Sequence, residues 1–237
     1  MSSFEWIIIP VTCHGSCITN WAAKVENKGL RLKLEDLDAS HPYLAERGIR
    51  KETAEEFGIG YFSGAGSMAD RIVIPIHNER GLLLAYAGRS IDGSAPKYKF
   101  SAGFHKSQVL YNLRRAIEGN LEARPSVAVV EGFFDCIKVH EAGFRCVALM
   151  DSSLSQEQGE LLDRHFAHVV LLFDGDEAGR AATDECLLRL GRRLWTKAIT
   201  LPKGKQPDQL SRDELQDLLA PKHSPKYASV VHGWHKR

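Results

Sequence analysis

Short apolar runs alternate with longer helical stretches throughout the second half of the chain. Four such runs occur, at 127–130, 145–149, 169–173 and 197–201. The first and third are apolar at every position, which is typical of strands buried on both faces of a sheet. The helical stretches between the runs are 134–142, 155–166 and 178–194. Strands separated by helices of this length favour right-handed βαβ units, so we predict an α/β fold with a parallel sheet flanked by helices.

The first half has a different pattern, which predicts an α+β subdomain. The expected elements are short helices at 42–48 and 51–57, a β-hairpin of 71–76 with 82–89, and a helix at 110–118. Pro75 lies within the first strand of this hairpin, so that strand needs an edge position or a bulge there. Between the hairpin and the last helix we expect an ordered loop rich in lysine and aromatic residues.

These patterns divide the chain into four segments. They are a poorly readable start at 1–40, a basic α+β subdomain at 41–123, the α/β domain at 124–220 and a basic, flexible tail at 221–237. Within the start, 6–11 is a candidate strand.

Carboxylates directly follow two of the predicted strands. Glu131 comes after the run at 127–130, and Asp174 and Asp176 come after the run at 169–173. Because the functional crevice of an open α/β sheet lies at the carboxyl ends of its strands, we expect these side chains to share one crevice. Carboxylates so close repel one another unless a cation lies between them, and their oxygens suit Mg²⁺ or Mn²⁺. A lone Asp-Gly-Asp is a common turn, but carboxylates after two strands favour a metal site for phosphoryl or nucleotidyl transfer.

Composition narrows the class of protein. The chain has 237 residues, of which 43% are hydrophobic, enough for a sizeable core. No apolar run approaches membrane-spanning length, and the start lacks the basic segment of a signal peptide. Five cysteines without a Cys-x-x-Cys pair fit free thiols in a reducing cytoplasm. Cys13, His14 and Cys17 lack the second ligand pair of a structural zinc site, so we do not expect zinc.

The net charge of +1 conceals a basic segment. Between residues 60 and 115, eight Lys or Arg stand against three acidic residues, which gives a local net charge of +5. The basic residues are Arg71, Arg80, Arg89, Lys97, Lys99, Lys106, Arg114 and Arg115. A basic segment beside an acidic metal site suits a polyanionic substrate, although it is equally typical of a solvated surface.

The carboxylates of the second half resemble the motifs of the Toprim domain, the metal-binding module of bacterial-type primases, topoisomerases and some nucleases. Glu131 and Asp135 in VVEGFFD are similar to its Glu-Gly-x-x-Asp element, and Asp174 and Asp176 in LLFDGDEAGR to its Asp-x-Asp element. The resemblance implies a Rossmann-like sheet and catalytic metal ligands at Glu131, Asp174 and Asp176. It gives Asp135 a supporting role, orienting a ligand or capping the next helix.

A later acidic position departs from the pattern. Asp208 matches an acidic residue of primases, where the family usually reads Asp-Pro-Asp and this chain reads Gln206-Pro207-Asp208. The resemblance implies that Asp208 is a further metal ligand. Because one carboxylate is replaced by Gln206, occupancy by a second or third metal is in doubt.

The first half of the chain limits the resemblance to one group of Toprim proteins. The stretches HPYLAERGIRKETAEEFGIGYF, DRIVIPIHNERGLLLAYAGRS and PKYKFSAGFHKSQVLYNL are similar to the helical start, the hairpin and the basic motif of the catalytic core in bacterial DnaG-type primases. The resemblance covers about residues 41–215 and implies DNA-templated synthesis of short RNA primers on single-stranded DNA. The zinc-ribbon and helicase-binding modules of such primases are not expected in this chain.

The same resemblance implies roles for the basic segment. Lys97 and Lys106 are expected to contact triphosphate or template phosphate, Arg71 and Arg89 to line the strand groove, and Tyr98 to stack on a base. Ribonucleoside triphosphates and single-stranded DNA are the implied partners, with a helicase or another replication or defence protein as a further candidate.

Two other functions stay open at this point. A Toprim nuclease would use the same carboxylates and needs a base, for which His105 and His140 are the nearest candidates. A non-catalytic nucleic-acid-binding subunit of a mobile-element or defence complex would fit the expected lack of a zinc module and the change at Gln206.

Overall fold

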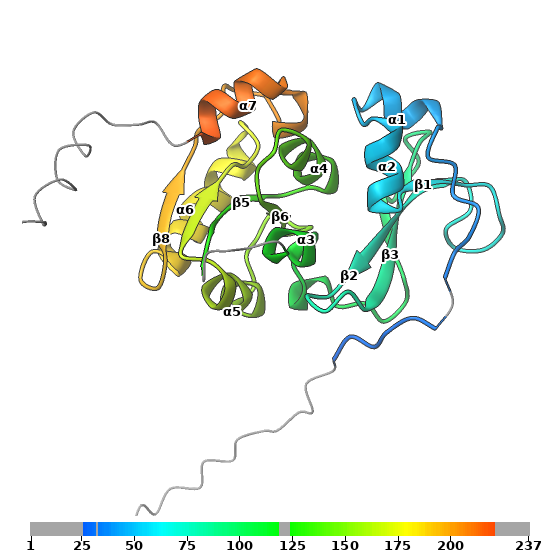
Figure 1. Ribbon diagram of the computed structural model, residues 1–237, viewed down its shortest axis with the longest axis horizontal. Helices are drawn as coiled ribbons and strands as arrows, with labels where there is room; N and C mark the ends of the chain where they lie inside the picture. The colour runs from blue at the N-terminus through cyan, green and yellow to red at the C-terminus, as the bar shows by residue number, and fades with distance from the viewer. Residues whose placement is uncertain (1–25, 32, 119–123, 221–237) are drawn as a thin grey trace, which may run out of the picture.

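Two four-stranded sheets lie side by side in the protein (Figure 1). The computed structural model describes residues 26–31, 33–118 and 124–220. Three sequence features therefore lie outside the described residues: the candidate strand at 6–11, the Cys13-His14-Cys17 cluster and the tail at 221–237. The predicted combination of an α+β part with a parallel, helix-flanked sheet is confirmed.

The first sheet is antiparallel, with the order β1-β2-β3-β4. Its strands are β1 (Gly60–Phe62), β2 (Arg71–His77), β3 (Leu83–Ser90) and β4 (Tyr98–Phe100). The predicted hairpin is β2 and β3, whereas β4 forms inside the segment predicted as a loop. Pairing of β1 with β2 ends at Val73, so Pro75 has no strand partner on that side and its missing N–H costs nothing there. The predicted helices are α1 (Pro42–Glu46) and α2 (Lys51–Phe57).

The second sheet is parallel, with the order β6-β5-β7-β8. Its strands are β5 (Ser126–Val130), β6 (Cys146–Ala148), β7 (His168–Leu171) and β8 (Trp195–Ala198). The helices around it are α3 (Leu113–Ile117), α4 (Phe133–Glu141), α5 (Gln156–His165), α6 (Glu177–Leu190) and α7 (Arg212–Leu219). Two 3-10 turns, η1 (Lys106–Gln108) and η2 (Pro207–Gln209), complete the described elements. Neither η2 nor α7 is predicted by the apolar pattern.

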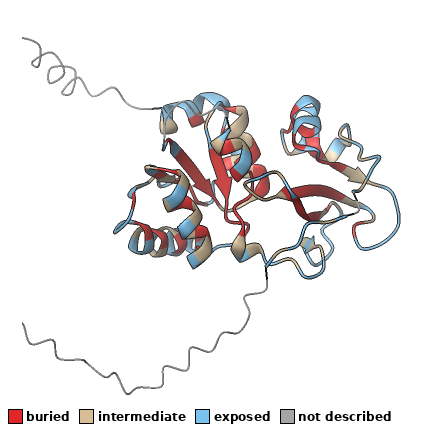
Figure 2. Ribbon diagram, turned by 60° about the horizontal axis from the view of Figure 1, so that its bottom comes forward, coloured by how far each residue is buried: buried red, intermediate tan, exposed pale blue. Residues whose placement is uncertain are grey.

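The parallel sheet is buried on both faces, as its apolar strands predict. Ala128 and Val130 of β5 face one core, which they share with α4 and α7, while Val127 and Val129 face the other, which α3, α5 and α6 cover. Figure 2 shows the buried residues concentrated in the strands of both sheets. Among the described residues, no helix is long and apolar enough to cross a bilayer.

One hydrophobic core joins the two sheets. It contains Leu44 of α1, Phe57 of α2 and Ile74 of β2 together with Phe133 and Phe134 of α4. Polar contacts reinforce the junction, because Lys138 Nζ donates to Gly48 O over 3.0 Å and Arg50 pairs with Glu141 at 3.3 Å. The α1–α2 pair is thereby fixed against α4, whose N-terminus begins next to Glu131.

Candidate active site

Glu131 and Asp174 come together because β5 and β7 are neighbours in the sheet. The backbone N–H of Asp174 donates to Glu131 Oε1 over 3.3 Å. Burial raises the pKa of Glu131 to about 7; this hydrogen bond opposes the rise, and the charges of Asp174, Asp176 and Asp151 add to it. The structure therefore brings two of the three predicted strand-end residues together, through a hydrogen bond from the Asp174 backbone to the Glu131 side chain.

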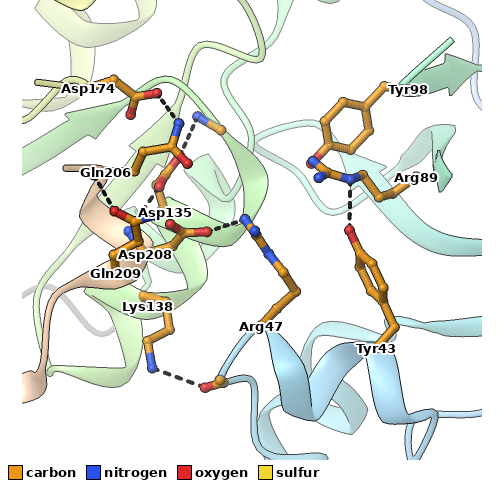
Figure 3. Close-up of polar contacts among 12 residues, drawn as sticks. Tyr43, Arg47, Arg89, Tyr98, Asp135, Lys138, Asp174, Gln206, Asp208 and Gln209 are labelled. Atoms are coloured by element: carbon orange, nitrogen blue, oxygen red, sulfur yellow. Dashed lines mark hydrogen bonds and ion pairs between the residues drawn. The ribbon is translucent and has the colours of Figure 1, made fainter. Parts of the chain in front are cut away.

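The carboxylate of Asp174 has one occupied and one unoccupied oxygen. Oδ2 accepts a hydrogen bond of 2.6 Å from Gln206 Nε2 (Figure 3), whereas Oδ1 is buried and has no hydrogen-bond partner. Burial raises the pKa of Asp174, the Gln206 bond opposes that rise, and the charges of Asp176 and Asp208 add to it. A buried carboxylate oxygen without a partner is costly unless a cation or proton meets it, so the side chain suits a hard cation such as Mg²⁺ or Mn²⁺.

Asp176 is turned toward its own helix. It is the N-cap of α6, and its Oδ1 accepts the N–H of Gly179 over 2.8 Å. A Cβ on Gly179 would lie 2.2 Å from Asp174 O, so only glycine allows this tight turn. Within the described ranges, no three His, Cys, Asp or Glu side chains form a ready-made metal cluster. Of the three predicted metal ligands, Glu131 and Asp174 thus lie together, while Asp176 caps a helix.

Asp135 and Asp208 lie close to Gln206, the residue that bonds to Asp174 (Figure 3). Asp135 Oδ2 accepts the N–H of Gly132 over 3.1 Å, and its Oδ1 accepts the N–H of Asp208 over 3.0 Å. Burial raises the pKa of Asp135 to about 7, with further contributions from Asp208 and Asp174. The side chain of Asp208 is only 5% exposed and forms an ion pair with Arg47. Asp208 therefore meets a guanidinium in the place where the sequence predicts a metal.

Basic residues and the carboxylates line one cavity of about 380 Å³. The cationic side chains in its lining are Arg47, Arg89, Lys97 and Lys106. Lys97 is exposed and makes no ion pair or hydrogen bond through its ammonium with the described part of the chain, while Lys106 pairs with Asp151 at 2.6 Å. Lys97 is thus the cation in this lining most available to an incoming phosphate.

Arg89 is held by two tyrosines. Its guanidinium donates to the hydroxyls of Tyr43 (3.0 Å) and Tyr98 (3.1 Å) and lies 5.0 Å from the ring centroid of Tyr98 (Figure 3). The same ring contacts Phe133 at 5.3 Å between centroids, so much of Tyr98 is already covered. Arg71 does not line the cavity; it donates to the carbonyl oxygens of Gly88 and Pro96 and braces the loop before β4.

Sequence reasoning missed three residues of this site. Asp151 comes shortly after the end of β6, with Leu149 and Met150 in between, so a search for carboxylates near strand ends would have found it. Arg47 is 161 positions from Asp208, and Tyr43 is 46 positions from Arg89, so no local pattern connects either pair.

Neither histidine proposed as a base for a nuclease lines the cavity. His140 contacts Glu56 at 3.2 Å and packs edge-on against Phe57, and the backbone of His105 bonds to Asn27.

Both parts of the fold match known families. Residues 128–211 match the family described as Toprim-like, and residues 65–117 match the family described as DNA primase catalytic core, N-terminal domain. A DNA primase of Staphylococcus aureus is 32% identical over 199 residues, covering 79% of this chain and 32% of that primase. The chain spans about a third of the length of the curated primases that it matches.

Solved structures agree with these matches. A DNA primase domain from Pseudomonas aeruginosa superimposes with a TM-score of 0.63 and 30% identity, covering 75% of this chain and 68% of that one. A DnaG primase catalytic domain bound to ssDNA superimposes with a TM-score of 0.62 and 27% identity, covering 74% and 68% respectively.

Proposed function

Because the chain belongs to the family of DnaG-type primase catalytic cores, we propose that it is a nucleotidyltransferase that makes short RNA primers on single-stranded DNA. The observation that carries this proposal is the contact of Glu131 with Asp174 at neighbouring strand ends, in a cavity that Lys97 also lines. A relative of known structure was solved with single-stranded DNA, which supports the choice of template. Such a protein would work in the cytoplasm.

Mg²⁺ or Mn²⁺ is the cofactor that these residues fit. Glu131 and Asp174 would hold it, with Asp176 as a further ligand, because all three offer hard carboxylate oxygens and Asp174 Oδ1 lacks a partner. When bound there, such a cation would lower the pKa of a primer 3′-OH and neutralise phosphate charge.

The chain's own cations would then bind and orient the nucleotide. Lys97 would contact the triphosphate directly, since its ammonium makes no hydrogen bond or ion pair with the described residues and only a longer-range attraction to Asp174. Lys106 must exchange the carboxylate of Asp151 for a phosphate. Tyr98 already carries Arg89 on its ring, so we assign it the role of holding that guanidinium toward the cavity in place of stacking on a base.

The test is incubation of the chain with single-stranded DNA, labelled ribonucleotides and Mg²⁺ or Mn²⁺, with products resolved on a gel. We expect short labelled RNA and intact DNA. Metal-dependent shortening of the DNA without nucleotides would instead show a nuclease. Binding without either reaction would show a non-catalytic subunit.

Lys97→Ala should weaken the binding of single-stranded DNA and flatten its salt dependence. Each phosphate contact on a single strand contributes about 0.7 log units of affinity per tenfold change in salt, so the slope should fall by about that amount. Fluorescence anisotropy at several salt concentrations measures it. Lys99→Ala is the matched control, since Lys99 is equally exposed and does not line the cavity. Equal slopes for the wild type and Lys97→Ala would refute the contact.

A further inference from the structure

Two side chains of this chain donate to carboxylates of the cavity, one a neutral amide and the other a cation (Figure 3). Asp174 receives the Gln206 amide at 2.6 Å, and Asp208 receives the Arg47 guanidinium. With its side chain 5% exposed, Asp208 cannot obtain a counter-charge from solvent and depends on Arg47. Both donors come from this chain.

The amide of Gln206 is held firmly against Asp174. The N–H of Gly175 donates to Lys205 O over 2.8 Å, and the N–H of Gly204 donates to Gly175 O over 3.1 Å. These bonds fasten the segment before Gln206 to the turn that carries Asp174. A Cβ on Gly175 would lie 2.1 Å from Pro202 O, so the two segments touch at backbone distance. The backbone that carries the Gln206 amide is therefore fixed beside the turn that carries Asp174.

Arg47 is equally fixed. It is the C-cap of α1, and its guanidinium lies 5.1 Å from the ring centroid of Phe134, a buried residue of α4. Its partner Asp208 is positioned in turn by the bond from its N–H to Asp135 Oδ1. Because arginine stays protonated at any physiological pH, a permanent positive charge is built in beside Asp208 and Asp135.

We propose that Arg47 and Gln206 take the place of a second divalent cation, so that this site binds one Mg²⁺ or Mn²⁺, held by Glu131 and Asp174. This inference rests on the metal site of the proposed function. A cation between Asp174 and Asp208 would have to displace the amide and would face the guanidinium at close range, where like charges repel strongly. Asp208 Oδ1 also lacks a hydrogen-bond partner, but its carboxylate already has the charge of Arg47. Asp208 is then a tether for α1 and not a metal ligand.

The test counts Mn²⁺ ions bound to the full chain by electron paramagnetic resonance titration. Sites that persist in Asp174→Ala are subtracted as surface binding. We expect one Mn²⁺ in the wild type and two in Gln206→Asp. The new carboxylate cannot donate a hydrogen bond to Asp174, and the two carboxylates together offer ligands for a second cation. Arg47→Met should also bind two, since it frees Asp208. Gln156→Asp and Arg50→Met are the matched controls: Gln156 is exposed on α5, and the side chain of Arg50 is 68% exposed.

The outcomes separate this inference from the proposed function. Two Asp174-dependent ions in the wild type would overturn the inference and leave the metal site intact. One ion in both wild type and Gln206→Asp would also overturn it. No bound ion in the wild type would overturn the inference and the proposed metal site together. If Arg47→Met does not fold by circular dichroism, Gln206→Asp alone decides, because that change removes no buried charge.

Discussion

Replacing Asp174 with alanine should abolish primer synthesis and leave the protein folded. Losing one charge-stabilising group at a reacting centre typically costs on the order of 10²–10³-fold in rate, and Asp174 supplies the buried oxygen that has no other partner. The free energy of unfolding without metal should change little. The substitution relieves repulsion from Asp176 and Asp208 but leaves the Gln206 amide without its acceptor. A primer-synthesis assay and a urea titration measure the two effects.

Asp184→Ala is the matched control for this experiment. Asp184 is exposed on α6, ten positions further along the chain, and does not line the cavity. It should keep full synthesis. Synthesis at the wild-type rate by Asp174→Ala, under conditions where Asp184→Ala is also active, would remove Asp174 from the catalytic machinery.

The metal-free protein should lose stability as the pH rises from about 4.5 to 7.5, and Asp135 should account for much of that loss. Burial, with the charges of Asp208 and Asp174, raises the pKa of Asp135 to about 7 from an ordinary value of 3.8. Between these two values the folded chain binds more protons than the unfolded chain, so raising the pH lowers the free energy of unfolding. Allowing for partial solvent screening, the contribution is about 2–4 kcal/mol.

Urea titrations of the wild type and of Asp135→Asn across this pH range measure the contribution. Asparagine cannot titrate. From pH 4.5 to 7.5 the free energy of unfolding of the wild type should therefore fall by about 2–4 kcal/mol more than that of Asp135→Asn. The variant also loses one acceptor for the N–H groups of Gly132 and Asp208, but that cost is the same at every pH. A difference independent of pH would show that Asp135 is ionised in the folded protein throughout.

Local pattern was enough to predict most of the strands and helices. Runs such as 127–130 and 169–173 are apolar at every position because their strands are covered on both faces. Ser155 and Gln158 form a capping box at the start of α5, and their types and spacing are readable from the sequence. The same kind of cap, Ser211 with Glu214, begins α7, so the sequence contained a signal for that helix as well. The short strand β4 forms only because β3 pairs with it, and the sequence on either side of it is broken up by Gly93, Pro96 and Gly103.

The sequence predicted the candidate site only where the order of the strands determines which residues lie close together. Glu131 and Asp174 follow neighbouring parallel strands, so the topology brings them together. Asp176 follows Asp174 by two residues, yet its side chain caps α6. Residue spacing alone cannot decide whether such a carboxylate caps a helix or points toward the metal site. The contact of Arg47 with Asp208 depends on how α1 docks against α4, which no periodicity encodes.

The hydrophobic core around α4 is shared by the two sheets, so the two halves of the protein cannot readily be separated. Phe133 and Phe134 belong to the helix that follows β5, yet they pack with α1, α2 and β2 from the other sheet. A fragment carrying the parallel sheet alone would present these rings to water as an exposed apolar patch, a hazard for aggregation. A chimaera of two relatives should therefore fold only when residues 42–117 and the parallel sheet that they cover come from the same protein. The two parts should also be inherited as one unit.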